Sequence, residues 1–271
     1  MNQLRFTKTF RMASQKIKTI LIDLSGTLHI DDDQTPGAVD ALKRLQANKN
    51  LHIKFVTNTT KESKNFLLNR LNKIGFSVTG DQVYTSLSAA RKLIDDKKLR
   101  PFFMIDKNAL EDFEGVPTHD PNAVLIGLAP EEFNYENMNK AMRLLQNGAS
   151  LIAIHKARYY KRNDGLALGP GPFVAALEYA TDVTAEVVGK PEANFFLSSI
   201  AELDCEPAQC VMVGDDVRDD IQGAQTVGMV GILVKTGKYR AGDESKINPA
   251  PYRVADNFSQ AVDYIEELLQ S

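Results

Sequence analysis

The sequence predicts an α/β fold, with a parallel-sheet core that is interrupted by a second domain. Short apolar runs typical of buried strands alternate with segments of helical periodicity along the chain. This series stops at about residue 88 and resumes at about residue 183. Because the same pattern returns after the interruption, we expect one domain to be inserted into the other.

The first part of the chain alternates strands and helices in regular order. A strand at 17–22 ends directly before Asp23, and a helix at 36–47 follows with its apolar positions on one face. The remaining elements of this part are expected as strand 51–56, helix 61–74, strand 83–85 and helix 87–98.

The pattern then restarts with strands at 101–105, 123–128 and 151–155 and helices at 135–147 and about 172–180. Pro172 suits the first turn of the last of these helices. The final part is expected as strand 185–188, helix 192–203, strand 210–213, helix 219–227, strand 230–234 and helix 258–269. We therefore expect an N-terminal extension at 1–15, a core formed by 16–87 and 183–271, and an inserted domain at 88–182.

The composition is that of an ordinary globular protein, with 43% hydrophobic and 25% charged residues. The formal net charge of −3 predicts no nucleic-acid partner, because such proteins usually carry a basic excess. No apolar run reaches the ~18 residues of a membrane span, so we expect no membrane partner. Cys205 and Cys210 have neither the number nor the spacing of a disulfide framework or a zinc site, which favours a reducing, cytoplasmic location.

The N-terminus leaves two interpretations open. Residues 1–22 contain basic residues, and the first carboxylate is Asp23. A basic, acid-free start is typical of a mitochondrial targeting segment. The alternative is a short disordered extension before the first strand, in which Met12 could itself begin the chain.

Polar groups follow the expected core strands at four places: Asp23, Thr57-Asn58, Lys190 and Asp215. Ligands of open parallel sheets bind beyond the carboxyl ends of the strands. Each group taken alone has an ordinary explanation as a turn former, a helix cap or a solvated lysine. Together they meet the separate needs of phosphoryl transfer, which are a nucleophile, neutralisation of charge and positioning of the reacting groups.

An aspartate can act as the nucleophile by forming an aspartyl-phosphate. Its own negative charge opposes approach to a phosphate, so we expect Mg²⁺ as the cofactor that offsets this repulsion. Lys190 adds a positive charge, and Thr57 and Asn58 offer a hydroxyl and an amide donor. Hard oxygen ligands are available from Asp215, Asp216, Asp219 and Asp220.

The sequence resembles the haloacid dehalogenase-like hydrolases from about residue 16 onward. The resemblance implies a Rossmann-like core with an inserted α/β cap domain of C2 type. Its four motifs are Asp23-Leu24-Ser25-Gly26-Thr27, Thr57-Asn58, Gly189-Lys190-Pro191 and Gly214-Asp215-Asp216 through Asp220. The implied catalytic residues are Asp23, Ser25 and Lys190. The implied Mg²⁺ ligands are the carboxylates of Asp23 and Asp215 and the backbone carbonyl of Ser25. The implied phosphate contacts are Asp23, Leu24, Ser25, Thr57, Asn58 and Lys190, while Asp220 would orient Lys190 or the metal shell.

Ser25 departs from the family pattern, which usually has a second aspartate there as general acid and base. A hydroxyl cannot do this near neutral pH, and such a group contributes roughly 10²–10⁴-fold to rate. The backbone contact to the metal survives, because any residue supplies a carbonyl. We therefore expect a small phosphorylated substrate whose leaving group needs little protonation, such as pyrophosphate or a phosphoramidate. The alternative is that a water or a cap residue replaces the missing acid.

Other readings of the chain stay open. One is a catalytically weakened regulatory or phosphate-binding protein of the same fold, against which the complete set of Asp23, Lys190 and Asp215 argues. Another is a phosphoacceptor signalling domain, which the inserted domain disfavours. The resemblance also leaves a homodimer open. The basic, tyrosine-containing stretch 155–162 resembles the family's substrate-specificity loop, although a solvated turn is the plainer interpretation.

Overall fold

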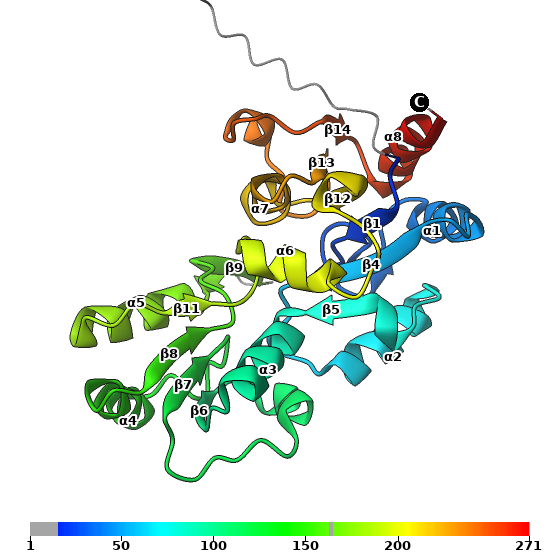
Figure 1. Cartoon of the computed structure of the whole chain (residues 1–271). Coiled ribbons are helices and arrows are strands. Elements are labelled where there is room, and N and C mark those ends of the chain that lie inside the picture. The colour runs from blue at the N-terminus through cyan, green and yellow to red at the C-terminus, as the bar shows by residue number, and fades with distance from the viewer. Residues whose placement is uncertain (1–15, 163–164, 271) are drawn as a thin grey trace, which may run out of the picture.

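The computed structural model describes residues 16–162 and 165–270. They form two parallel sheets, each covered by helices, and two small antiparallel hairpins (Figure 1). The expectation for residues 1–15 falls outside the described residues. Among the helices of the described ranges, none has the length and apolar character needed to cross a membrane.

The larger sheet has six parallel strands. Their spatial order is β14 (Arg253–Ala255), β13 (Val230–Val234), β12 (Cys210–Gly214), β1 (Thr19–Ile22), β4 (His52–Thr57) and β5 (Val83–Thr85). The central strands β1 and β12 are buried along their whole length, which explains their continuous apolar sequences. Ile22 lies beside both Val213 and Phe55, so β1, β12 and β4 end at the same edge.

Helices cover both faces of the larger sheet. One face carries α1 (Ala38–Ala47), α2 (Lys64–Ile74) and α8 (Phe258–Gln270), and the other carries α6 (Ala193–Ile200) and α7 (Gly223–Thr226). Successive side chains of a strand point to opposite faces. Accordingly, Ile20 and Ile22 pack with the first group of helices, whereas Leu21 packs with the second.

The smaller sheet has four parallel strands in the order β11 (Glu186–Val187), β8 (Ser150–Ala153), β7 (Ala123–Ile126) and β6 (Pro101–Met104). One face is covered by α4 (Tyr135–Gln146) and α5 (Gly171–Thr181), and the other by α3 (Ser86–Lys97) and the 3-10 helix η2 (Lys107–Phe113). The predicted α/β class, with a Rossmann-like parallel core and a second α/β part, is confirmed.

Two hairpins and several short turns complete the described chain. The hairpin of β2 (His29–Ile30) and β3 (Asp33–Gln34) follows β1, and the hairpin of β9 (Tyr159–Arg162) and β10 (Gly165–Leu168) follows β8. Short 3-10 turns lie at η1 (Gly80–Gln82), η3 (Pro207–Gln209) and η5 (Asp243–Ser245).

The strand expected at 185–188 is present as β11, but it does not join the larger sheet. It pairs with β8, with Val187 beside Ala153. The backbone N–H of Gly189 still donates to Ile154 of the smaller-sheet part, while that of Lys190 already donates to Asn58 of the larger-sheet part. An apolar run gives no indication of which sheet edge it joins, so the assignment of this strand to the core was wrong. The domain boundaries at 88 and 183 themselves stay a prediction.

Candidate functional site

Four groups that the sequence places after strands meet at one edge of the larger sheet. Asp23 follows β1 and Asp215 follows the neighbouring strand β12, and the backbone N–H of Asp23 donates to the Val213 carbonyl at 2.9 Å. Thr57 ends β4 on the other side of β1. Lys190 reaches the same edge from the connection after β11. The parallel strands therefore bring together residues that are far apart in sequence.

The ammonium of Lys190 is enclosed by protein acceptors. Its Nζ donates to Asp23 Oδ1 at 2.5 Å, to Asp220 Oδ1 at 2.6 Å and to the Val56 carbonyl oxygen at 3.0 Å. An ammonium has three N–H donors, so these contacts use them all. Burial alone would lower the pKa of Lys190, but the charges of Asp220 and Asp23 outweigh this effect and hold the pKa well above its usual value. Lys190 is therefore a permanent positive charge.

Asn58 fixes the backbone of Lys190. Its Oδ1 accepts a hydrogen bond from the Lys190 backbone N–H, and its Nδ2 donates to the Lys190 carbonyl oxygen, each at 2.9 Å. Gly189 is required beside this contact, because a Cβ there would lie 2.5 Å from Asn58 Oδ1 and 2.5 Å from the Ile154 carbonyl oxygen. The amide of Asn58 thus already positions Lys190, and its predicted contact with phosphate stays a prediction.

Three further predicted site residues are presented in different ways. The side chain of Leu24 is buried in the core, so only its backbone can face a substrate. Thr57 is also buried, at the end of β4. Ser25 is exposed, in a turn that the Gly26 N–H closes by donating to the His29 carbonyl at 2.7 Å. Of these three side chains, that of Ser25 is the one that solvent reaches.

The carboxylates near the sheet edge suit a divalent cation. Asp23, Asp215 and Asp220 each offer an oxygen, and these atoms lie within 4.8 Å of one another. Asp215 Oδ2 accepts the Lys238 backbone N–H at 2.6 Å, whereas its Oδ1 is buried and has no hydrogen-bond partner among the described residues. Burial and the charge of Asp23 raise the pKa of Asp215 to about 7. An unpartnered buried oxygen is destabilising unless a ligand takes it, and hard oxygens are what Mg²⁺ prefers.

Asp220 differs from Asp215 because both its oxygens are engaged. Oδ1 accepts from Lys190, and Oδ2 accepts the Asp216 backbone N–H at 3.0 Å. Asp216 in turn caps the next element, accepting the N–H groups of Arg218 and Asp219 at 3.0 Å. The helix expected at 219–227 accordingly begins as a π-helical turn, η4 (Val217–Gln222), and continues as α7.

A loop that the sequence reasoning missed completes the site. Thr236, after β13, donates its hydroxyl to the Gly26 carbonyl at 2.5 Å, and Lys238 contacts Asp215 through its backbone N–H. Gly237 has φ +52°, and a Cβ there would lie 2.0 Å from Asp215 Oδ2. A Cβ at Gly26 would lie 2.1 Å from the same atom. The available signal was a Thr-Gly-Lys sequence one residue after an apolar strand, a placement close to the one that identified the other groups.

The smaller-sheet part approaches the site through His155, just after β8. Burial and the charge of Lys238 lower the pKa of His155 to about 4, so its ring is neutral near neutral pH. The ring Nδ1 lies 3.2 Å from the Ala157 backbone N–H and accepts its hydrogen bond, which leaves the ring proton on Nε2. Lys156 is paired with Glu178 at 2.7 Å. The expected role of the stretch 155–162 as a substrate-specificity loop stays a prediction.

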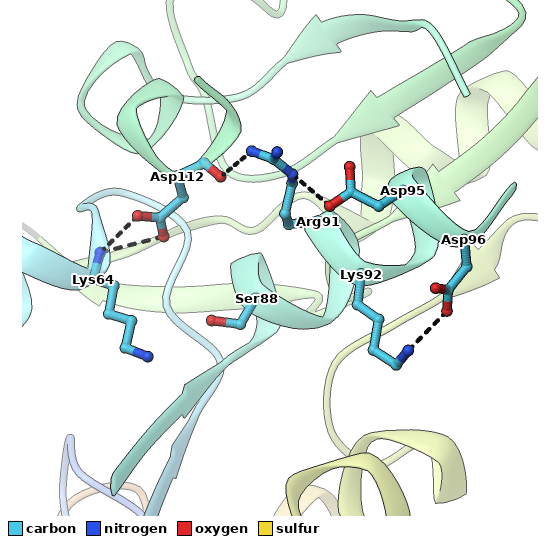
Figure 2. A pocket seen from close by; sticks show the side chains of 7 residues that line it. All are labelled: Lys64, Ser88, Arg91, Lys92, Asp95, Asp96 and Asp112. Carbon is cyan, nitrogen blue, oxygen red and sulfur yellow. Dashed lines mark hydrogen bonds and ion pairs between the residues drawn. The ribbon is translucent and has the colours of Figure 1, made fainter. Parts of the chain in front are cut away.

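A cavity of about 400 Å³ lies away from these residues, along α3 and beside the beginning of α2 and the end of η2 (Figure 2). Several of its charges are already satisfied, since Arg91 pairs with Asp95 at 2.8 Å and Lys92 with Asp96 at 2.9 Å. Its lining residues in the described part of the chain are Lys64, Ser88, Arg91, Lys92, Asp95, Asp96 and Asp112. None of the predicted site residues is among them, so the candidate site is at the sheet edge.

Sequence comparison gives consistent matches. Residues 20–116 match the profile described as haloacid dehalogenase-like hydrolase, and residues 187–261 match the profile described as HAD-hydrolase-like. Haloacid dehalogenase-like hydrolase domain-containing protein 2 of Rattus norvegicus is 61% identical, over 94% of this chain and 98% of that protein. Phospholysine phosphohistidine inorganic pyrophosphate phosphatase of Homo sapiens is 36% identical, over 92% of this chain and 94% of that protein.

Solved structures are similar over the same extent. A 4-nitrophenylphosphatase from Thermotoga maritima has a TM-score of 0.84 at 25% identity, covering 91% of this chain and 97% of its own. A glycerol phosphate phosphatase from Mycobacterium tuberculosis, in complex with magnesium, has a TM-score of 0.79 at 27% identity, covering 91% of this chain and 78% of its own. Given this similarity along nearly its whole length, the chain belongs to the haloacid dehalogenase-like hydrolase family.

Proposed function

We propose that this protein is a Mg²⁺-dependent phosphatase that passes the phosphoryl group of its substrate to Asp23 and then to water. The observation that carries the proposal is the buried Lys190 ammonium between Asp23 and Asp220, beside the unpartnered oxygen of Asp215. This arrangement offers a fixed carboxylate, a fixed positive charge and a place for a divalent cation. The phosphatase names of the human relative and of both structural neighbours support this reaction class.

Mg²⁺ would be held by the carboxylates of Asp23 and Asp215 and by the backbone carbonyl of Ser25. When bound, the ion offsets the negative charge of the phosphate oxygens and holds them in place. Asp220 is a weaker candidate ligand, because its oxygens accept from the Lys190 ammonium and from a backbone N–H, whereas Oδ2 of Asp23 accepts a hydroxyl at the longer distance of 3.2 Å. The magnesium complex of the M. tuberculosis phosphatase supports a divalent cation in a fold of this kind.

The chain's own residues hold the nucleophile ready. Asp23 Oδ1 is fixed by Lys190, and Asp23 Oδ2 accepts the hydroxyl of Thr27 at 3.2 Å. An oxygen of Asp23 bonds to phosphorus as the bond to the leaving group breaks, and water later cleaves the aspartyl-phosphate and restores the carboxylate. Since the carboxylate is oriented before the substrate arrives, little reorganisation is left for the reaction itself.

The exposed Ser25 guides the proposed substrate class. A serine hydroxyl cannot protonate a leaving group near neutral pH, so the enzyme should prefer leaving groups that need little protonation. Pyrophosphate and phosphoramidates meet this requirement better than alkyl phosphates. The name of the human relative, which mentions phospholysine, phosphohistidine and inorganic pyrophosphate, supports this preference.

The test is phosphate release from p-nitrophenyl phosphate, pyrophosphate and phospholysine, with and without Mg²⁺, by the wild type and by Asp23→Asn. We expect turnover that requires Mg²⁺ and that Asp23→Asn abolishes. Folded protein that turns over none of the three substrates would instead favour a phosphate-binding, regulatory role.

A second series addresses the role of Ser25. Phenyl phosphates with leaving groups of graded pKa should react faster as the leaving group becomes more acidic, because no protein acid assists its departure. Rates that do not depend on leaving-group pKa would show that a water or another residue protonates the leaving group.

A further inference from the structure

The hydrogen bonds of Lys190 leave none of its N–H donors for a substrate. All its N–H donors are directed to Asp23, Asp220 and the Val56 carbonyl, and its side chain is only 3% exposed. Lys190 therefore offsets negative charge in the site. It has no free N–H donor to bind the part of a substrate beyond the reacting phosphorus. A substrate with a second anionic group needs another cation.

Lys238 is a second cation beside the carboxylates of the site. Its backbone N–H is bonded to Asp215, which fixes the residue at the site, while its side chain is 67% exposed. Among the described residues, its Nζ makes one ion pair, with Asp216 at 3.5 Å, and the charges of Asp216 and Asp215 raise the pKa of Lys238. Its charge also contributes to lowering the pKa of His155, which follows β8 of the smaller-sheet part. Exposed pairs of this kind contribute little to stability, so the ammonium is available to a ligand.

We propose that Lys238 is a substrate-binding residue that holds a second phosphoryl group, on the leaving-group side of a diphosphate substrate. This assignment rests on the proposed phosphatase function and narrows its substrate class. In the reaction of a diphosphate, Asp23 bonds to one phosphorus while the bridging oxygen departs with the bonding electrons. The leaving phosphate gains negative charge, which Lys238 offsets, and it takes its proton from solvent. Water then releases the second phosphate from Asp23.

The same placement explains how the site functions with serine at position 25. A general acid stabilises a leaving group by giving it a proton, whereas a fixed cation stabilises it by charge alone. Charge stabilisation serves a phosphate leaving group well, because that group is anionic. It serves a neutral alcohol poorly. Ser25 and Lys238 therefore point to the same substrate class from independent observations.

Lys238→Gln separates this role from a structural one. The bond to Asp215 uses the backbone N–H, so the substitution keeps it and removes only the ammonium. Lys235→Gln is the matched control, since Lys235 lies in the same loop and its ammonium pairs with Asp256 at 3.0 Å. Lys238→Arg restores the charge at the tested position.

The experiment is calorimetric binding of imidodiphosphate, a diphosphate that resists hydrolysis, and of inorganic phosphate, at fixed free Mg²⁺. We expect Lys238→Gln to weaken imidodiphosphate binding about tenfold or more and phosphate binding less than about twofold, in line with loss of one charge-assisted contact. Lys238→Arg should recover most of the loss, and Lys235→Gln should bind both ligands as the wild type does. In turnover, Lys238→Gln should raise KM for pyrophosphate more than KM for p-nitrophenyl phosphate.

Equal weakening of both ligands, or of neither, would overturn the assignment, as would a wild type that binds imidodiphosphate no more tightly than phosphate. Because the binding arm needs no turnover, it decides the role of Lys238 even if the chain hydrolyses none of the substrates. The phosphatase proposal fails separately, through turnover that Asp23→Asn leaves intact or through its absence in the wild type.

Discussion

Replacement of Lys190 by methionine measures how far the buried charges depend on their central cation. Met has a similar volume without charge, so packing should change little. At an effective dielectric constant of about 20, unit charges ~2.6 Å apart attract by about 6 kcal/mol, and desolvation offsets most of this. Removal of one partner leaves Asp23 and Asp220 uncompensated in a buried site. We expect Lys190→Met to lower the free energy of unfolding by about 3–5 kcal/mol.

Urea unfolding at pH 7 in the presence of EDTA measures this loss. Two checks identify its cause. Asp220→Asn added to Lys190→Met removes one uncompensated charge, so the double variant should be more stable than Lys190→Met alone by about 1–3 kcal/mol. Lowering the pH to about 5 should also restore stability to Lys190→Met, because the uncompensated carboxylates take up protons. A loss below about 1 kcal/mol, or a double variant less stable than the single one, would refute the electrostatic explanation.

Gly26→Ala places a methyl group 2.1 Å from Asp215 Oδ2 and should weaken calorimetric Mg²⁺ binding, whereas Gly228→Ala, with a similar φ (+92° against +93°) and open space, should lose only about 1–2 kcal/mol of stability to backbone strain. If the two variants bind Mg²⁺ with similar affinity, the close approach of Gly26 to Asp215 does not matter for the metal site. Ser25→Asp supplies the missing acid and should raise kcat for alkyl phosphates relative to pyrophosphate, by up to roughly 10²-fold; an unchanged ratio would contradict this. The fold raises the pKa of Asp215 to about 7, so its proton stabilises the metal-free protein fully below about pH 4, and that contribution is lost as the pH rises through 7. Mg²⁺ must displace this proton, so Mg²⁺ should raise the Tm of the protein more at pH 8 than at pH 5.5. An equal increase in Tm at both pH values would count against Asp215 as a ligand.

Much of the site was predictable because strand ends are readable in sequence. The apolar runs before Asp23, Thr57 and Asp215 form buried parallel strands, and parallel strands bring their carboxyl ends to one edge. Lys190 was harder, because the strand before it joins the smaller sheet. Its placement depended on the motif around it, since no periodic pattern states which edge a short strand pairs with.

Other features could not be read from the sequence, because they depend on which atoms approach in space. The amide of Asn58 was expected to face phosphate, yet it holds the backbone of Lys190 across 132 positions of sequence. The role of Lys238 arises from one backbone hydrogen bond to Asp215, which side-chain chemistry alone does not suggest. Leu24 lies within a functional motif, yet its side chain packs in the hydrophobic core.

The charges of the site explain why a divalent cation and the fold belong together. Three buried carboxylates, those of Asp23, Asp215 and Asp220, surround the buried ammonium of Lys190, while the exposed ammonium of Lys238 pairs with a fourth carboxylate, that of Asp216. Negative charge is therefore in excess when all four are ionised. In a buried site this excess opposes folding, and either a proton on Asp215 or a bound cation relieves it. A divalent cation relieves it without neutralising Asp215 by protonation, and it is also what an anionic nucleophile needs to approach a phosphate. The same electrostatic excess that destabilises the metal-free protein therefore favours the state in which Asp23 can react.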